Sequence, residues 1–433
     1  MLGFDHELRR HGFAGNNCQI VLELAGTISA DALRERLAQL AREFPILNAR
    51  PGGVIHPRWR VPRAATPPAV RVHQHESGVE ERLLNEPLAV ARGELARFDL
   101  IEISGARTRL AFTWAHALMD APGAEEFLAW AGEVGVPPSS GAGVPPATEG
   151  VSPSNQHPHG RDARHDRRGA SPTAPPLRQR LQTAWKSIHH LDRFCEVKPQ
   201  SIGTRHPAAP AKLHYQTVRF TAEETAAARA HAVRLCGLLG DAQFHATVSL
   251  CELHKLRARL GCASPSYVLP MPVGLRPKGR IEPVFSNQLS MLMVQLFPAQ
   301  LGSVADAVAA FKLQMEHALR TGLIESGRTL AELFRFLPLP LYVFMVKQGL
   351  RGEIGSLFFG DTAAVNPKLT NFLGVPVEDF THVAAITPSP GLGVIFYYFR
   401  GLLRLTVVHS ARVFTKAEAD EFTASLRARL LAP

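Results

Sequence analysis

The stretch TRLAFTWAHALMDAPGAEEFLAW (residues 108–130) changes its hydrophobic period halfway, and the change predicts a strand followed by a helix. In the first half, side chains alternate between two faces, as they do along a β-strand. The face with the larger side chains carries Leu110, Phe112, Trp114 and His116. In the second half, Ala121-Pro122 opens a helical pattern, and proline is tolerated there because the first helical N–H groups have no partner within the helix. His116 is therefore expected at the end of a strand, and Asp120 just before a helix.

The spacing His-x-x-x-Asp at this junction has two interpretations. A neutral imidazole at a strand end, partly dry and facing a cavity, suits a general base. A histidine beside apolar residues is also often a core residue with satisfied hydrogen bonds, and an aspartate before a helix is often an N-cap. The spacing alone leaves both interpretations open for His116 and Asp120.

The composition of the chain excludes several classes of protein. Its 433 residues are 45% hydrophobic and 20% charged, as in soluble globular proteins of two or three domains. No uncharged apolar run reaches the roughly 18 residues of a membrane span. The closest run, residues 334–350, is interrupted by prolines and charges. The charged amino terminus does not fit a signal peptide, so we expect a cytoplasmic protein.

Charge and cysteine content narrow the expected partners. A net charge of +10 favours anionic partners such as nucleic acid, anionic lipid or a phosphorylated cofactor like coenzyme A. Because the basic residues are scattered without interleaved aromatic residues, we expect no nucleic-acid binding. Peripheral contact with a membrane or lipid is retained as an expectation. Five cysteines without a C-x-x-C spacing predict neither a disulfide framework nor a metal site.

A segment poor in large apolar residues divides the chain. Residues 137–178 are rich in Pro, Gly, Ser and His, and such a segment cannot bury enough surface to offset its ordering entropy. We expect a disordered linker there, between an N-terminal lobe of residues 1–136 and a C-terminal lobe of residues 179–433. Both lobes mix strand and helix patterns, which predicts an α/β (α+β) fold. Helices are expected at residues 29–45, 177–194, 221–240, 241–261, 303–322 and 415–431, and strands at 18–24, 96–103, 212–220, 266–276, 290–297, 393–399 and 402–410.

The motif HALMDAPG (residues 116–123) resembles the H-x-x-x-D-G signature of the coenzyme A-dependent acyltransferase superfamily. Its members include chloramphenicol acetyltransferase, condensation domains of nonribosomal peptide synthetases and bacterial wax ester synthase/diacylglycerol acyltransferases. Residues 22–53 are similar to the opening strand and helix of the superfamily, and residues 269–298 and 369–408 to blocks of the wax ester synthase branch. The resemblance implies two chloramphenicol acetyltransferase-like lobes, each a mixed sheet with helices, that form a V around a central tunnel.

The chain departs from the superfamily pattern at several positions. Ala115 stands where many members have a first histidine, and Ala121 replaces the glycine after the aspartate. The Asn-Asp pair of the wax ester synthase branch aligns with His245–Ala246. Asn48 falls where condensation domains often carry an arginine, and Arg50 is close by. These departures bear on the substrate class more than on the fold, and they leave room for a member that has lost catalysis.

The resemblance also implies a role for each candidate residue. His116 would act as the general base that takes the proton from an acceptor hydroxyl or amine as it attacks a thioester. Asp120 would hold the loop in place, paired with Arg276 or Arg50, and would relay no proton. Asn371 is the expected donor to the tetrahedral oxyanion. The expected substrate-binding residues are Trp114, Gly123, Arg276, Ser286 and Asn287.

The function implied by the resemblance is acyl transfer from a coenzyme A or carrier-bound phosphopantetheine thioester to an alcohol or amine. The thioester would be a co-substrate, and no permanently bound cofactor is expected. Two alternatives stay open. One is a freestanding condensation-type enzyme that forms amides on acyl carrier proteins, and the other is a catalytically inactive acyl- or lipid-binding member of the same fold.

Overall fold

The structure is a computed structural model of the chain. It describes residues 2–53, 58–64, 66–103, 106–133, 175–194, 196–238, 240–277, 280–334, 336–338, 340–341, 344–345, 355–387 and 389–432. Most of the predicted linker, up to residue 174, lies outside the described residues. Its last two residues, 177 and 178, already belong to a helix.

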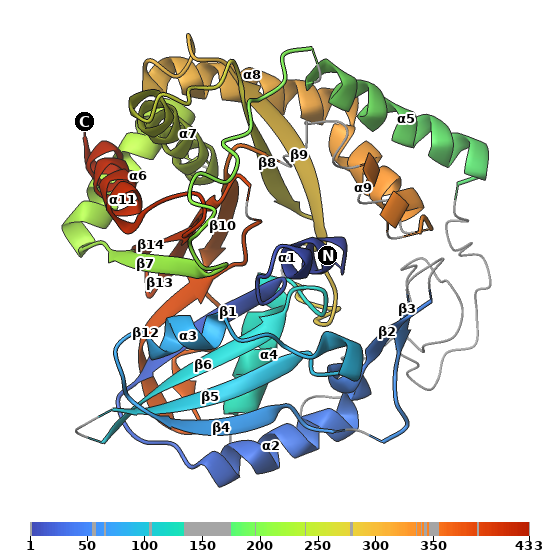
Figure 1. The fold of residues 1–433 in the computed structure, drawn as a ribbon, viewed down its shortest axis with the longest axis vertical. Helices are drawn as coiled ribbons and strands as arrows, with labels where there is room; N and C mark the ends of the chain where they lie inside the picture. Colours follow the sequence, from blue (N-terminus) through green and yellow to red (C-terminus); the bar gives the residue numbers. More distant parts are fainter. Residues whose placement is uncertain are drawn as a thin grey trace, which may run out of the picture.

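The described residues form a mixed α/β fold, as predicted (Figure 1). The helices are α1 (Leu2–Arg10), α2 (Ala30–Glu43), α3 (Val79–Leu84), α4 (Ala121–Gly132), α5 (Leu177–Phe194), α6 (Ala222–Cys236), α7 (Asp241–Arg259), α8 (Val304–Thr321), α9 (Leu323–Phe334) and α11 (Lys416–Leu431), with short 3-10 turns η1 (Pro45–Asn48) and η2 (Val90–Arg92). The strands are β1 (Asn17–Leu24), β2 (Arg50–Gly52), β3 (Arg58–Arg60), β4 (Ala69–Gln74), β5 (Ala96–Ile103), β6 (Arg107–Ala115), β7 (Leu213–Arg219), β8 (Tyr267–Gly274), β9 (Leu289–Leu296), β10 (Phe358–Ala364), β11 (Asn371–Phe372), β12 (Val375–Val383), β13 (Leu392–Phe399) and β14 (Leu402–Ser410).

Local sequence signals explain where several helices begin. Ser29 caps α2 by accepting a hydrogen bond from the backbone N–H of Ala32. Thr221 and Glu224 form the predicted capping box of α6, in which each side chain accepts from the backbone N–H of the other residue. These caps satisfy N–H groups that have no partner inside the helix, so the helix starts are encoded by neighbouring residues.

The first sheet lies in the lower part of Figure 1 and has the strand order β11-β12-β1-β6-β5-β4. Helix α4 packs on the face that carries Phe112, whose ring centroid is 5.7 Å from that of Phe127. Helix α3 covers the opposite face through a small buried cluster that includes Val21, Leu83 and Ala111. The larger face predicted from the alternation of residues 108–116 is therefore the face that forms the core of this lobe.

The first sheet is not made from the N-terminal half of the chain alone. Strand β12 belongs to the predicted C-terminal lobe, yet it pairs antiparallel with β1 along its length, with Gln19 opposite Val383 and Leu22 opposite Phe380. The predicted boundary at the linker therefore does not separate two independent lobes in space, because β12 comes from the C-terminal part of the chain and pairs with β1 in the first sheet.

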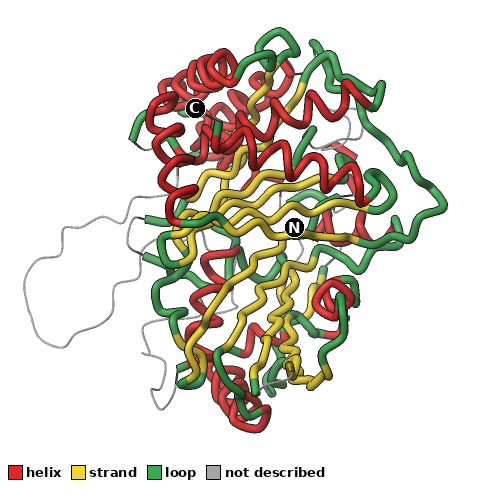
Figure 2. The backbone as a smooth tube through the Cα atoms, turned by 90° about the vertical axis from the view of Figure 1, so that its left-hand side faces the viewer, coloured by secondary structure: helices red, strands yellow, loops and turns green. Residues whose placement is uncertain are grey.

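The second sheet has the order β10-β13-β14-β7 and lies above the first in Figure 1. The predicted hairpin of β13 and β14 is present, with Phe399 paired to Leu402 across the turn at Arg400 and Gly401. Helices α6, α7, α8 and α11 contribute to a second core with this sheet, which includes Phe244, Phe311, Phe396, Leu405 and Phe422. In Figure 2 the strands of the two sheets run in clearly different directions.

The hairpin of β8 and β9 connects the two lobes. Its strands pair antiparallel from Tyr267 opposite Leu296 to Gly274 opposite Leu289. Figure 1 shows the hairpin descending from the upper lobe, so that the loop between its strands reaches the lower lobe beside α4. This loop brings residues 275–288 against the motif of the opening stretch.

Side-chain contacts also join the lobes on the side of α3. The amide of Asn85 donates to the carbonyl of Leu213 and accepts from its N–H, both at 2.8 Å. The carboxylate of Glu81 lies 3.0 Å from the Nδ1 atom of His214. Because α3 belongs to the first lobe and β7 to the second, these contacts fix the two lobes relative to each other. Across the described residues, no helix is both long and apolar enough to cross a membrane.

Candidate active site

The predicted junction of strand and helix is present at residues 115–121. Strand β6 ends at Ala115, and Asp120 caps α4 by accepting a hydrogen bond of 3.1 Å from the N–H of Gly123. Between them, the N–H of His116 donates to the carbonyl of Asn16 at 2.9 Å. The backbone of the motif is therefore tied to both neighbouring elements.

The His116 ring is partly buried and has free hydrogen-bonding capacity. Its Nδ1 atom is enclosed and has no partner of ordinary hydrogen-bond geometry. No hydrogen bond of ordinary geometry joins its Nε2 atom to the described residues. Burial lowers the pKa of His116, although the backbone of His116 and Met119 and the charge of Asp120 oppose the shift. The ring is thus neutral at neutral pH, as a general base must be.

Asp120 is 1% exposed, and its carboxylate is used by the protein. Oδ1 accepts from Nη2 of Arg276 at 2.6 Å, and Oδ2 accepts from the N–H of Gln288 at 2.9 Å. Of the two arginines expected as its partner, the structure has Arg276, whereas Arg50 is exposed on β2. Within the described part of the chain, no hydrogen bond joins this carboxylate to the His116 ring. These contacts join Asp120 to the β8–β9 loop, and its expected loop-positioning role stays a prediction.

The loop between β8 and β9 holds the other side of the motif. The carbonyl of Ser286 accepts from the N–H of Asp120 at 3.2 Å, and the amide of Asn287 donates to the carbonyl of His116 at 2.9 Å. Both residues were expected at the site, and the structure places them against the backbone of the motif. The Oδ1 atom of Asn287 is buried without a partner. Gln288, which the sequence analysis did not single out, completes this contact through its backbone.

Gly123 allows this loop to approach closely. A Cβ atom at this position would lie 2.3 Å from the carbonyl oxygen of Val284, which is a backbone atom that cannot rotate away. The structure therefore gives Gly123 a packing role. The expected contact of Gly123 with a substrate stays a prediction.

The expectation that Trp114 touches a substrate needs correction. Its side chain is 1% exposed, stacks on Phe112 with 5.2 Å between ring centroids, and donates from Nε1 to the carbonyl of Met119 at 3.1 Å. Its one polar atom is already bound within the protein, so Trp114 has no polar group left to bind a substrate. Trp114 instead supports the motif from behind, because its hydrogen bond fixes the residue just before Asp120.

The expectation that Asn371 stabilises an oxyanion beside His116 is wrong in position. Asn371 is exposed on β11 and pairs with Pro376 at the start of β12, whereas the end of β6 lies near the end of β12, where Val383 sits. The seven residues from Pro376 to Val383 span about 23 Å at roughly 3.3 Å per residue. Asn371 and His116 therefore lie at opposite ends of the same sheet.

Two titratable residues near the motif escaped the sequence analysis. Glu125 of α4 is buried, and burial together with the nearby charge of Asp120 raises its pKa to about 8, although the N–H of Asn366 donates to it at 2.8 Å. His382 of β12 is buried with its ring centroid 6.0 Å from that of Trp114. A single histidine in an apolar strand and an acid in an apolar helix carry no spacing signal, so the pattern alone could not have found them.

The position of the missing Asn-Asp pair is occupied by a different contact. His245 of α7 lies with Nδ1 2.9 Å from Oδ2 of Asp361 on β10, and its ring stacks on Phe396 at 4.2 Å. Both partners are buried in the core of the second lobe. This pair therefore joins α7 to the second sheet and takes no part in the site at His116.

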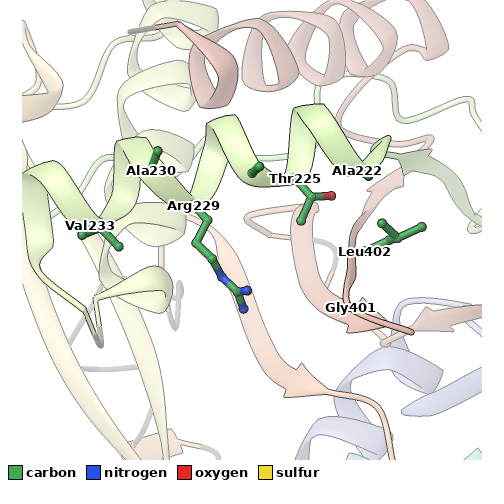
Figure 3. Close-up of a pocket in the computed structure, with 8 residues that line it drawn as sticks. Ala222, Thr225, Arg229, Ala230, Val233, Gly401 and Leu402 are labelled. Atoms are coloured by element: carbon green, nitrogen blue, oxygen red, sulfur yellow. The ribbon is translucent and has the colours of Figure 1, made fainter.

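A separate pocket lies between α6 and the turn from β13 to β14. Figure 3 shows the Arg229 side chain projecting from α6 toward it, with Leu402 at its other side. Arg229 lies over the ring of Tyr398 at 4.9 Å and 3.7 Å from Asp241. The lining contains none of the predicted site residues. The described residues also contain no group of three or more His, Cys, Asp or Glu side chains arranged to hold a metal.

Solved structures identify the fold. The first condensation domain of the calcium-dependent antibiotic synthetase, in complex with a substrate analogue, aligns with a TM-score of 0.65 at 15% identity over 99% of this chain and 94% of that domain. The trichothecene 15-O-acetyltransferase TRI3 from Fusarium sporotrichioides aligns with a TM-score of 0.63 at 13% identity, over 99% and 94% of the two chains. A starter condensation domain of rhizomide synthetase in complex with C8-CoA gives 0.60 at 14% identity, over 99% and 93%.

No protein-family profile and no curated protein sequence matches the chain. The structural similarity nevertheless extends over nearly the whole chain, and it includes both a condensation domain and an acetyltransferase. The chain therefore has the fold shared by these condensation domains and this acetyltransferase, which is the fold that the motif at residues 116–123 predicted. At 13–15% identity this similarity establishes the fold, and the reaction has to be argued from the site.

Proposed function

We propose that this chain transfers an acyl group from a thioester of coenzyme A or of a carrier-bound phosphopantetheine to an alcohol or amine, with His116 as the general base. The observation that carries the proposal is the state of the His116 ring. It is neutral at neutral pH, partly buried, without a hydrogen bond of ordinary geometry from either ring nitrogen to the described residues, and presented on a backbone that is held from both lobes. A core histidine with satisfied hydrogen bonds would show none of this free capacity.

The proposed reaction begins with a proton transfer. Nε2 of His116 takes the proton from the acceptor hydroxyl or amine, and the acceptor lone pair attacks the carbonyl carbon of the thioester. The tetrahedral intermediate then collapses, the carbon–sulfur bond breaks, and the thiolate takes the proton back from the imidazolium. General-base assistance of this kind supplies roughly 10²–10⁴-fold in rate, and alignment of the two substrates supplies several kcal/mol more.

The surrounding residues would keep the base in position during this cycle. Asp120 and Arg276 neutralise each other beside the motif, while Asn287 fixes the carbonyl of His116. These contacts cross from the first lobe to the β8–β9 loop, so the base is held where the two lobes meet. We infer that substrates approach along this boundary, as the expected central tunnel requires, and that the thioester binds as a co-substrate.

Structures of the same fold motivate the donor class. A rhizomide synthetase starter condensation domain is solved with C8-CoA, and TRI3 is an O-acetyltransferase. The condensation-type alternative, amide formation on a carrier protein, uses the same base and the same tetrahedral chemistry. The two differ in the donor, because a condensation enzyme would discriminate in favour of a carrier-bound thioester and against free coenzyme A thioesters. The third alternative, an inactive acyl- or lipid-binding protein, would bind the thioester and release no thiol.

The proposal is tested by following thiol release from a series of straight-chain acyl-CoAs and acyl-phosphopantetheinyl carrier proteins, each with panels of alcohols and amines. We expect acceptor-dependent release in the wild type and a fall of at least 100-fold in kcat for His116→Ala. His75→Ala is the matched control, because His75 is exposed and its N–H binds Glu102, at the end of β5 far from Ala115. Equal turnover by His116→Ala and the wild type would overturn the proposal, and binding without release by the wild type would favour the inactive alternative.

A further inference from the structure

His382 lies against the same part of the first sheet as the motif. It is opposite Ile20 on β1, and Trp114 of β6 is opposite Cys18, two residues away on the same strand. The rings of His382 and Trp114 are therefore on one face of the sheet, with 6.0 Å between their centroids and an interplanar angle of 29°. Trp114 in turn donates to the carbonyl of Met119, within the motif that carries His116.

The His382 ring is enclosed by protein but is not satisfied by it. Its side chain is 3% exposed, and Nδ1 is buried without a hydrogen-bond partner. The hydroxyl of Tyr397 on β13 accepts a hydrogen bond from the backbone N–H of His382 at 3.4 Å and leaves the imidazole unbound. The rings of the two residues lie edge to face, with 6.5 Å between their centroids. A buried polar group without a partner is costly, so its presence beside a candidate site points to a ligand atom as the missing partner.

The ionisation state of His382 suits a hydrogen-bond donor. Burial, reinforced by the neighbouring His116, lowers the pKa of His382 to about 4. The ring is therefore neutral at neutral pH and always carries one N–H group. A neutral imidazole donates a hydrogen bond to a developing negative charge without losing the proton, because the pKa for deprotonation of the neutral ring lies far above neutral pH. His116 and His382 are thus both neutral at neutral pH, and both lie near Trp114: one can serve as a base and the other as a hydrogen-bond donor.

We propose that His382 donates a hydrogen bond to the carbonyl oxygen of the bound acyl thioester and stabilises the oxyanion that forms there. The proposal rests on the proposed acyl transfer and supplies the donor for which Asn371 is misplaced. When the acceptor attacks, the carbonyl π electrons move onto oxygen, and the N–H of His382 binds that oxygen without transferring its proton. When the C=O bond re-forms and the thiolate leaves, the same hydrogen bond weakens and the ring is unchanged.

The main test compares His382→Phe with His409→Phe. Phenylalanine keeps an aromatic ring of similar size but removes both ring nitrogens. His409 of β14 is a close match for the control: it is buried, its Nδ1 also lacks a partner, and burial lowers its pKa to about 4, but it stacks on His214, away from the motif. With the best donor found above, we expect His382→Phe to lower kcat by about 10²–10³-fold with KM changed less than threefold. His409→Phe should keep wild-type kcat.

A binding measurement separates this role from simple packing. An acyl-CoA analogue in which CH₂ replaces the thioester sulfur keeps the carbonyl, whereas an alkyl thioether of coenzyme A lacks it. We expect the wild type to bind the carbonyl analogue at least fivefold more tightly, and His382→Phe to bind both equally. His382→Gln, which restores an N–H donor, should recover part of the preference and of kcat.

The outcomes distinguish the two proposals. If the wild type turns over acyl-CoA, His116→Ala is inactive and His382→Phe is fully active with an unchanged carbonyl preference, the role of His382 is overturned and the general-base proposal stands. If the wild type neither binds nor turns over any thioester, both proposals fail together. A loss of kcat in His382→Phe with an unchanged carbonyl preference and a lowered Tm would assign His382 to packing and would also overturn its role as a donor.

Discussion

Arg276 Nη2 lies 2.6 Å from Asp120 Oδ1 and joins the β8–β9 loop of one lobe to the first turn of α4 in the other. Both side chains are at least nine-tenths buried, and the Nε and Nη1 atoms of Arg276 have no other partner. Within the described residues, Asp120 is therefore the one ion-pair partner of Arg276, and its loss would leave an uncompensated charge beside the candidate base.

We expect Arg276→Ala to lower the free energy of unfolding by about 3–5 kcal/mol, because removing one partner of a buried ion pair leaves the other charge unpaired. The double variant Asp120→Asn/Arg276→Met should lose less than Arg276→Ala, since it buries no charge. Urea unfolding of the full chain measures both values. If the loss in the double variant, relative to the wild type, equals the sum of the losses in Asp120→Asn and Arg276→Met measured separately, the two side chains are not coupled.

Glu125 makes the stability of the protein depend on pH. Its pKa is raised from 4.5 to about 8 by burial, so between these values the folded state holds a proton that the unfolded state has lost, and stability falls as pH rises. Glu125→Gln keeps an acceptor for the N–H of Asn366 and removes the charge. We expect the variant to be more stable than the wild type by a few kcal/mol at pH 8.5, at roughly 1.4 kcal/mol per pKa unit, with little difference at pH 4.5.

Chemical denaturation at pH 4.5, 6.5 and 8.5 would measure this difference. Glu378→Gln is a suitable control, because Glu378 is exposed and paired with Arg107 at the surface. A difference between Glu125→Gln and the wild type that stays constant from pH 4.5 to 8.5 would show that Glu125 does not titrate in this window.

Gly123→Ala should disturb the contact between α4 and the β8–β9 loop. The new methyl group would lie 2.3 Å from the carbonyl oxygen of Val284, so the backbone must shift. We expect a loss of about 1–3 kcal/mol in stability, as for other overpacked buried sites. Gly274→Ala provides the control, because a Cβ there meets nothing within 4 Å. Equal thermal stability of the two variants would contradict this account of Gly123.

Asn85 should contribute to the attachment of the lobes. Its amide makes two hydrogen bonds of 2.8 Å with the backbone of Leu213, so Asn85→Ala leaves a backbone donor and an acceptor unpaired. We expect a loss of about 1–3 kcal/mol in the free energy of unfolding.

Asn371→Ala should change neither stability nor turnover, because Asn371 is exposed and distant from His116. A strong loss of turnover in Asn371→Ala would restore it as a site residue.

The sequence predicted those features that depend on neighbouring residues. The change of period in residues 108–130 located both β6 and α4, and the capping residues Ser29 and Thr221 located the starts of α2 and α6. Helix α5 begins and ends at the predicted residues, Leu177 and Phe194. Each of these elements is encoded within a few turns of chain, so hydrophobic period and caps were sufficient to find it.

The features that sequence analysis missed depend on residues far apart in the chain. The pairing of β1 with β12 joins residues more than 350 positions apart, as for Gln19 and Val383, and no local pattern encodes it. The same pairing moves Asn371 to the far end of the sheet and brings His382 beside Trp114. Likewise, only the packing of the β8–β9 loop on α4 decides that Arg276, and not Arg50, binds Asp120.

The pH dependence of thiol release tests the central claim about His116 most directly. The base must be neutral to act, and burial lowers its pKa from 6.5, so kcat/KM in the wild type should rise to a plateau through an apparent pKa below 6.5. His116→Ala should lose at least 100-fold on the plateau and lose the ascending limb itself. If His116→Ala keeps the wild-type rate and the same limb, His116 is not the base and the proposed reaction is wrong.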